Sequence, residues 1–207
     1  MGVITDLKFQ KKKDRVNLFV DGKFALGLPL EIVYKAKLSI GRKISRRRLE
    51  KLAQESGLEK VLNKVYRFLS FRPRSRKEIE RYLRGKKVGE VFKNLVIRQL
   101  ERQGYVDDWK FACWWVEQRI EGRPVSKEIL KRELFQKGIS PKISSKIIQS
   151  LLPPPNLLAL KVAQKKAERY KDLPLAELRR KLTRILARRG FDWETIKETV
   201  DKIQKSR

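Results

Sequence analysis

Asp107 and Asp108 are the most compact acidic pair in the sequence, and paired carboxylates can bind a divalent metal or perform acid–base catalysis. Because they stand directly before Trp109 and Phe111, they are better explained as a helix N-cap and a first turn that complements the helix dipole. The chain has no His and one Cys, so histidine catalysis, an internal disulfide and the usual zinc sites are excluded. No glycine group has the spacing of a phosphate-binding loop. We therefore expect no catalytic residues, no metal and no cofactor.

The basic residues offer a different chemistry, which is the binding of anions. The 52 Lys and Arg residues outnumber the 24 Asp and Glu residues, giving a formal charge of +28, while 41% of the residues are hydrophobic. A chain that can bury a core and carries this excess is typical of a protein that binds a polyanion, most often nucleic acid. No apolar run approaches the roughly 18 residues of a membrane helix, and the N-terminus lacks a signal-peptide pattern. We expect a cytoplasmic protein with no membrane partner.

The first part of the chain has the alternating pattern of β-strands. Val16, Leu18 and Val20 alternate with polar residues, and Asp21-Gly22 then predicts a tight hairpin turn. Residues 5–9 should add a third strand, with a turn at 11–14. After Pro29 the hydrophobic period changes from 2 to 3.6, which predicts roughly nine amphipathic helices from about residue 57 onward.

An internal repeat organises the helical part. When the sequence is aligned with itself at an offset of 51 residues, Ser75 aligns with Ser126 and Leu83 with Leu134, and five further pairs of apolar residues also align. An offset of 52 residues extends the alignment to a third copy. Repeats of this size must pack against their neighbours to bury a continuous hydrophobic core. The sequence predicts a mainly α protein: an N-terminal β-rich extension with a short helix at 1–50, then three-helix modules at 57–106, 107–152 and 156–205 in an elongated, curved array.

Basic residues recur at three equivalent positions of the modules. These sets are Arg76, Lys127 and Arg179; Arg81, Arg132 and Arg184; and Lys86, Lys137 and Arg189. At 100° per residue, Arg81 lies about 150° from the centre of the buried stripe, so the second set should face solvent. Further candidates for binding a partner or nucleic acid come from the dense segment around Ser75 and its helix: Arg72, Arg74, Lys77 and Arg84. A solvated helix face explains any one of these residues, but repetition favours contact with a polyanion or an acidic protein.

Several segments resemble the RecX family, the bacterial regulators of the RecA recombinase. Residues 72–79 are similar to the family's Arg-x-x-Ser-x-x-Glu-Leu helix start, with Ile79 in place of Leu, and residues 104–112 to its Gly-Tyr-hydrophobic-Asp-Asp-x-x-Phe-Ala element. Residues 133–139 resemble Glu-Leu-x-x-Lys-Gly-Ile of the second module, and residues 189–191 resemble Arg-Gly-Phe of the third. The resemblance covers about residues 57–205.

The resemblance implies a protein without catalytic activity that lodges in the groove of the RecA filament on DNA, and we expect this protein to be a monomer. It implies inhibition of recombinase, ATPase and co-protease activity, and it leaves open direct contact with single- or double-stranded DNA. Two alternatives remain from the residues themselves. One is a stand-alone DNA- or RNA-binding protein whose modules act like helix-turn-helix units. The other is an enzyme acting on nucleic acid, for which Asp107 and Asp108 would have to hold a metal.

Overall fold

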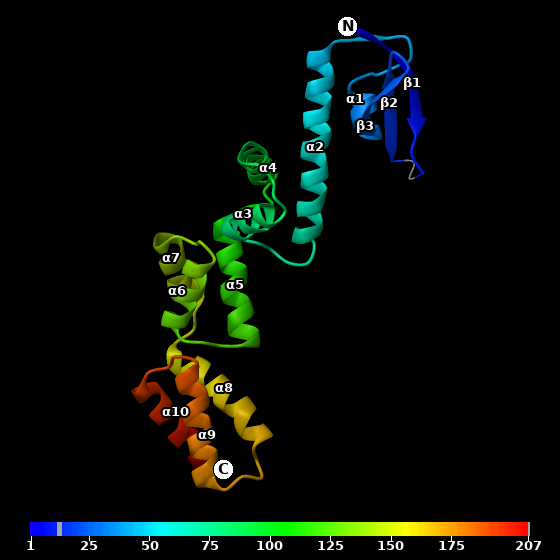
Figure 1. Cartoon of the computed structure of the whole chain (residues 1–207). Helices are drawn as coiled ribbons and strands as arrows, with labels where there is room; N and C mark the ends of the chain where they lie inside the picture. Colours follow the sequence, from blue (N-terminus) through cyan, green and yellow to red (C-terminus); the bar gives the residue numbers. More distant parts are fainter. Residues whose placement is uncertain (12–13, 207) are drawn as a thin grey trace. The chain divides into compact units, whose positions relative to one another are not determined.

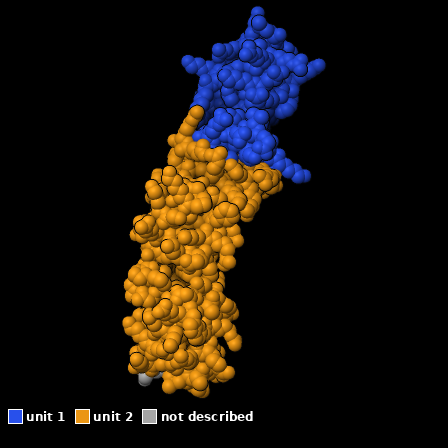
Figure 2. Space-filling model, turned by 90° about the vertical axis from the view of Figure 1, so that its left-hand side faces the viewer, with its two compact units in different colours: residues 1–72, 87–99 blue, residues 73–86, 100–207 orange. Residues whose placement is uncertain are grey.

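The computed structural model describes residues 1–11 and 14–206 and divides into two compact units. Unit 1 comprises residues 1–72 and 87–99, and unit 2 comprises residues 73–86 and 100–207 (Figure 2). The helix from the middle of the predicted first module belongs to unit 2, whereas most of the helix that follows it belongs to unit 1.

Unit 1 contains a small antiparallel sheet, which confirms the predicted strands. Strands β1 (Gly2–Phe9), β2 (Arg15–Val20), β3 (Lys23–Pro29) and β4 (Lys43–Ile44) are arranged in the order β3-β2-β1-β4. Asp21 and Gly22 have φ angles of 49° and 74°, as a two-residue hairpin turn requires. The predicted turn at 11–14 includes residues 12–13, which lie outside the described residues.

The sheet buries one face against the helices that follow it (Figure 1). Leu18 and Leu28 are fully buried with Leu52, which lies on α2 (Arg46–Leu69), and the short helix α1 (Leu30–Lys35) contributes Ile32 and Val33. Helix α2 begins after the N-cap Ser45, well before the predicted start near residue 57. The reason is that its first turns bury Leu52 on the sheet, so that Gly57 lies inside a continuous helix.

The middle of α2 approaches the part of α4 (Glu90–Arg102) that belongs to unit 1. A Cβ atom at Gly57 would lie 3.6 Å from the ring of Phe92, which is ordinary van der Waals contact. Val65 on α2 and Val96 on α4 are fully buried.

Unit 2 contains α3 (Arg76–Gly85) and two complete three-helix bundles. The first bundle is formed by α5 (Asp108–Gly122), α6 (Lys127–Gln136) and α7 (Pro141–Leu151), and the second by α8 (Pro155–Arg169), α9 (Leu175–Arg188) and α10 (Trp193–Lys205). Leu130 and Leu134 of α6 are fully buried, and so are Leu182 and Leu186 at the equivalent positions of α9. The prediction of a mainly α protein, with three-helix modules after a small antiparallel sheet, is confirmed.

Across the described part of the chain, we find no helix with both the length and the apolar character needed to span a bilayer.

Candidate interaction surface of the middle helices

The middle helices of the three predicted modules, α3, α6 and α9, all lie in unit 2, so their charged residues can be compared within one body. Helices α3 and α6 begin at serine N-caps: Ser75 accepts a hydrogen bond from the backbone N–H of Glu78, and Ser126 accepts one from Ile129. Helix α9 differs, because its N-cap is Pro174 and no side chain caps it.

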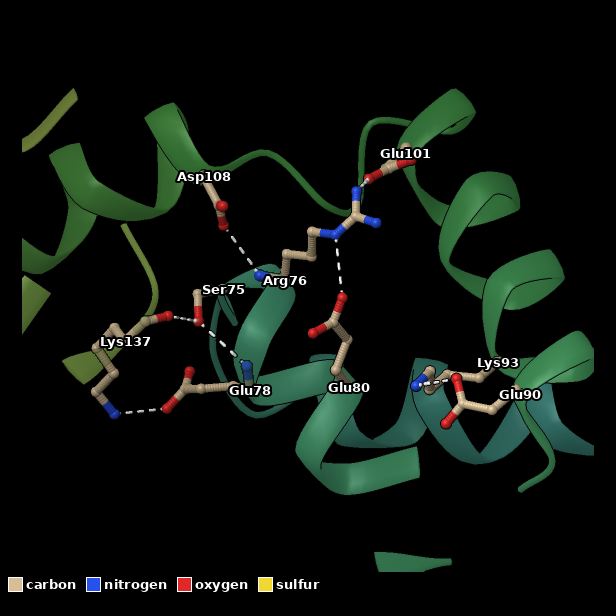
Figure 3. Close-up of polar contacts among 9 residues, drawn as sticks. All are labelled: Ser75, Arg76, Glu78, Glu80, Glu90, Lys93, Glu101, Asp108 and Lys137. Atoms are coloured by element: carbon tan, nitrogen blue, oxygen red, sulfur yellow. Dashed lines mark hydrogen bonds and ion pairs between the residues drawn. The ribbon is translucent and has the colours of Figure 1, made fainter. Parts of the chain in front are cut away.

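The loop after α6 docks on the start of α3 (Figure 3). Ser75 Oγ donates a hydrogen bond to the carbonyl oxygen of Lys137 at 2.6 Å, and Lys137 Nζ lies 2.5 Å from Glu78 Oε1. Gly138 follows with φ +87°, and a Cβ atom there would lie 2.6 Å from the Cβ of Lys77. Lys137 is therefore part of an internal junction, and glycine is required beside it.

A similar junction joins the two bundles. The backbone N–H of Ser126 donates to the carbonyl oxygen of Arg189 at 2.8 Å, and Arg189 Nη1 donates to the carbonyl oxygen of Pro124 at 2.8 Å. A Cβ atom at Gly190 would lie 2.7 Å from both Ser126 Oγ and Ile129 Cδ1. The sequence signal for both junctions is the recurrence of a basic residue followed by glycine, at Lys137-Gly138 and Arg189-Gly190.

The equivalent position after α3 is different. Lys86 is exposed, with its ammonium 5.6 Å from the ring centre of Tyr82, and it is followed by Lys87 instead of glycine. Lys87 has a φ of 55°, so the left-handed conformation is kept although the residue type is not.

In the first set of recurring basic residues (Arg76, Lys127 and Arg179), the two arginines already form ion pairs with acidic side chains. Arg76 Nε lies 3.1 Å from Glu80 Oε1, and its Nη1 also pairs with Glu101 (Figure 3). Arg179 Nη1 lies 2.9 Å from Asp201 Oδ1 and donates to Gln204 Oε1. These arginines fix the middle helix of a module to a neighbouring helix, whereas Lys127, the third member, is exposed.

The second set has the orientation that helical spacing predicts. Arg81, Arg132 and Arg184 are all exposed, and none forms an ion pair with another described residue. Arg72 and Arg74, which precede α3, are partly buried and engaged in contacts within the chain. Of the proposed contact residues, the second set is therefore the one that recurs with its charge available to a partner.

A hollow of about 360 Å³ lies beside α3, and we refer to it as the basic hollow. Four cationic side chains line it, together with Gly138 and two carboxylates: Arg76, Lys77, Arg81, Arg84, Glu80 and Asp108. Burial raises the pKa of Asp108 above its ordinary value, although the backbone N–H of Arg76, which donates to Asp108 Oδ1 at 2.9 Å, acts in the opposite direction.

The acidic pair acts as a cap, as predicted. Asp107 accepts hydrogen bonds from the backbone N–H groups of Trp109 and Lys110 at the start of α5, while Asp108 accepts from Arg76 at the start of α3. The described residues include no group of three His, Cys, Asp or Glu side chains placed to hold a metal ion.

Trp115 belongs to a polar network that sequence reasoning missed. Its Nε1 donates to Glu133 Oε2 at 3.0 Å, and Arg119 forms a two-point pair with the same carboxylate at 2.7 and 2.8 Å. The Arg119 guanidinium and the Lys137 ammonium lie 5.0 and 4.8 Å from the indole ring centre. Trp115 is therefore partly buried and packs against the core of the first bundle, and no sequence spacing indicated its partnership with Glu133 of α6.

Tandem three-helix bundles joined by similar junctions define a helical-repeat protein. Comparison with known families shows to which family of such proteins the chain belongs. The model of the regulatory protein RecX N-terminal domain matches residues 2–45, that of the RecX first three-helix domain matches residues 62–91, and that of the third matches residues 158–200. Regulatory protein RecX of Listeria monocytogenes (serovar 1/2a, strain EGD-e) is 30% identical over 91% of this chain and 70% of its own length. The chain belongs to the RecX family of regulatory proteins.

Other relatives agree with this assignment. Regulatory protein RecX of Bacillus subtilis (strain 168) is 28% identical over 99% of this chain and 78% of its own length. A crystal structure of regulatory protein RecX has a TM-score of 0.71 at 24% identity and covers 97% of this chain and all of its own. The RecX structure from Lactobacillus salivarius has a TM-score of 0.56 at 23% identity over 71% of this chain and 96% of its own. The solved structures support the fold.

Proposed function

We propose that this chain regulates the RecA recombinase by binding the RecA filament on DNA, and that binding inhibits recombinase, ATPase and co-protease activity. Membership of a family of regulatory proteins supports a protein partner. The structural observation that carries the proposal is the recurrence of exposed arginines, Arg81, Arg132 and Arg184, along unit 2.

A filament is a suitable partner because it repeats. The two junctions join equivalent helix ends, so the three arginines recur in register with the modules that carry them. A series of equivalent charges complements a surface that presents the same acidic group on successive protomers. Each contact is weak at an exposed site, but several contacts made by one molecule act together. Bound across several protomers, the protein would hinder extension and turnover of the filament.

Stand-alone, sequence-specific nucleic-acid binding is the weaker function. Base reading in a groove relies on amide and basic side chains near the start of a recognition helix. The first turns of α3, α6 and α9 carry no Asn or Gln, and the one arginine among them, Arg76, is paired with Glu80 and Glu101. Tight binding to duplex DNA with a clear sequence preference, in the absence of RecA, would favour this function over the filament proposal.

The test measures DNA-dependent ATP hydrolysis and strand exchange by the host RecA with increasing amounts of this protein. We expect inhibition at stoichiometric amounts. The triple variant Arg81→Glu, Arg132→Glu, Arg184→Glu should need at least roughly tenfold more protein for the same inhibition, because each contact becomes repulsive.

A matched variant controls for net charge. Arg47→Glu, Lys51→Glu, Lys60→Glu makes the same change in charge at exposed positions of α2 in unit 1, and it should inhibit like the wild type. The proposal is rejected if the wild-type protein leaves both RecA activities unchanged. An equal loss in the two triple variants would show that total charge, not the repeated arginines, is responsible.

A further inference from the structure

One face of α3 carries a row of cations directed to the basic hollow. Lys77, Arg81 and Arg84 are separated by four and three residues, the spacing that brings helical side chains together on one face. None of the three forms an ion pair with another described residue. Like charges at this spacing repel each other, so an anion among them would relieve an unfavourable interaction.

The carboxylates in the basic hollow do not neutralise this row, because they have other partners. Glu80 pairs with Arg76, and Asp108 accepts the backbone N–H of Arg76 (Figure 3). Arg76 is further engaged by Glu101. Four cationic side chains face two carboxylates, and the three cations of the row remain available.

The basic hollow is also shaped before any ligand arrives. The stem of Lys77 lies over Gly138, with its Cβ 2.6 Å and its Cδ 2.8 Å from the place a Cβ would occupy. The junction between α3 and the loop after α6 therefore sets where the Lys77 side chain begins. A volume of about 360 Å³ falls within the roughly 300–1,000 Å³ of small-molecule sites.

The chemistry of the lining selects the class of ligand. Guanidinium groups donate paired hydrogen bonds to phosphate oxygens, and an ammonium adds a mobile point charge. None of the described lining residues is aromatic, so the hollow offers no ring on which a base could stack. The lining thus favours phosphate groups over the bases attached to them.

We propose that the basic hollow binds closely spaced phosphate groups through Lys77, Arg81 and Arg84, supplied either by a nucleic-acid backbone or by a free polyphosphate such as a nucleoside triphosphate. The site belongs to this chain alone and requires no recombinase. Its success or failure in a binding experiment is therefore separate from that of the filament proposal.

The experiment is calorimetric titration of the full-length protein at low ionic strength. The probes are inorganic tripolyphosphate, a twelve-nucleotide oligothymidylate and hexaglutamate. Arg81→Gln, Arg84→Gln should weaken tripolyphosphate binding roughly tenfold, the effect of losing two ion pairs at exposed positions. The control Arg47→Gln, Lys60→Gln removes two exposed charges from unit 1 and should bind like the wild type.

A third variant tests whether a negative charge in the lining of the basic hollow weakens phosphate binding. Asp108→Asn removes a negative charge and keeps a side-chain oxygen to accept from Arg76, so it should bind tripolyphosphate more tightly than the wild type. Thermal unfolding by circular dichroism verifies that each variant is folded.

The probes distinguish the two sources of phosphate. Loss of oligothymidylate affinity in Arg81→Gln, Arg84→Gln, with a salt dependence shallower by roughly 1.4 in the log–log slope, identifies a nucleic-acid backbone. A loss confined to tripolyphosphate identifies a free polyphosphate. The proposal is overturned if neither phosphate probe binds, if the control loses as much affinity as the test variant, or if hexaglutamate binds as tightly as tripolyphosphate.

Discussion

At the scale of single residues, the two junctions explain why glycine follows Lys137 and Arg189. Gly138 and Gly190 combine a positive φ with a neighbouring side chain closer than 3 Å to the missing Cβ. Gly104 has a similar φ of +74° but open space around it. Substitutions at these two kinds of glycine can therefore separate the cost of backbone strain from the cost of crowding around an added methyl group.

This difference predicts unequal effects of alanine. Gly104→Ala should lower the free energy of unfolding by about 1 kcal/mol, the cost of the left-handed conformation. Gly138→Ala should cost about 3 kcal/mol, because the new methyl group also displaces Lys77 from the junction. Urea unfolding followed by tryptophan fluorescence measures this in unit 2, where Trp109, Trp114, Trp115 and Trp193 all lie. Equal losses in the two variants would contradict the packing explanation.

Sequence patterns predicted individual residues only where local spacing decides the outcome. The caps Ser75 and Ser126 and the exposure of Arg81 follow from helix geometry. The pairing of Arg76 with Glu101 does not, because it joins residues that are 25 positions apart in the chain. For the same reason, the two-point pair between Arg119 and Glu133 had no signal in the sequence.

At the scale of elements, the same side chain can begin one helix and fasten another segment. Ser75 is fully buried, caps α3 and donates to the carbonyl oxygen of Lys137. Ser140 caps α7 but is exposed. The strands and most helices followed from hydrophobic period, whereas the start of α2 did not, because burial on the sheet decides it.

The two serines predict different costs of substitution. Ser140→Ala should lower the free energy of unfolding by about 1 kcal/mol, the usual value of a cap. Ser75→Ala should cost about 2–3 kcal/mol, because it also leaves the Lys137 carbonyl without its donor. The same fluorescence-monitored urea unfolding compares them, and an equal cost would show that the contact from Ser75 to Lys137 contributes little.

The cap of α10 makes stability depend on pH. The backbone N–H and the hydroxyl of Thr195 both donate to Asp192, and these hydrogen bonds lower the pKa of Asp192 below its ordinary value of 3.8. A lowered pKa in the folded state means that the stabilisation is complete at neutral pH and is lost as the pH falls through the folded value.

Replacing the carboxylate should remove this dependence. Asp192→Asn keeps a capping oxygen, so we expect stability at pH 7 close to that of the wild type and a weaker decline between about pH 4 and pH 2. Asp192→Ala should lose about 1 kcal/mol at pH 7. Unfolding midpoints measured across this range provide the test, and an unchanged acid decline in Asp192→Asn would assign it to other carboxylates.

At the scale of the whole molecule, the charge of +28 determines how the protein meets an anionic partner. Long-range attraction increases the rate of association and is screened by salt. If the chain inhibits RecA as proposed, raising the salt concentration from about 50 to 200 mM should weaken that inhibition. The dependence should be shallower for Arg81→Glu, Arg132→Glu, Arg184→Glu, and a salt-independent inhibition would contradict an electrostatic contact.

The two ends of the repeat series lack the groups that join its modules. At one end Lys87 occupies the place taken by Gly138 and Gly190, and at the other end Pro174 replaces the capping serine. A lysine side chain would fill the space that a neighbouring helix needs. A proline has neither the hydroxyl that Ser75 donates nor the backbone N–H that Ser126 donates. We therefore expect the chain to terminate its own series at both ends, so that separate copies do not polymerise head to tail into fibres of their own.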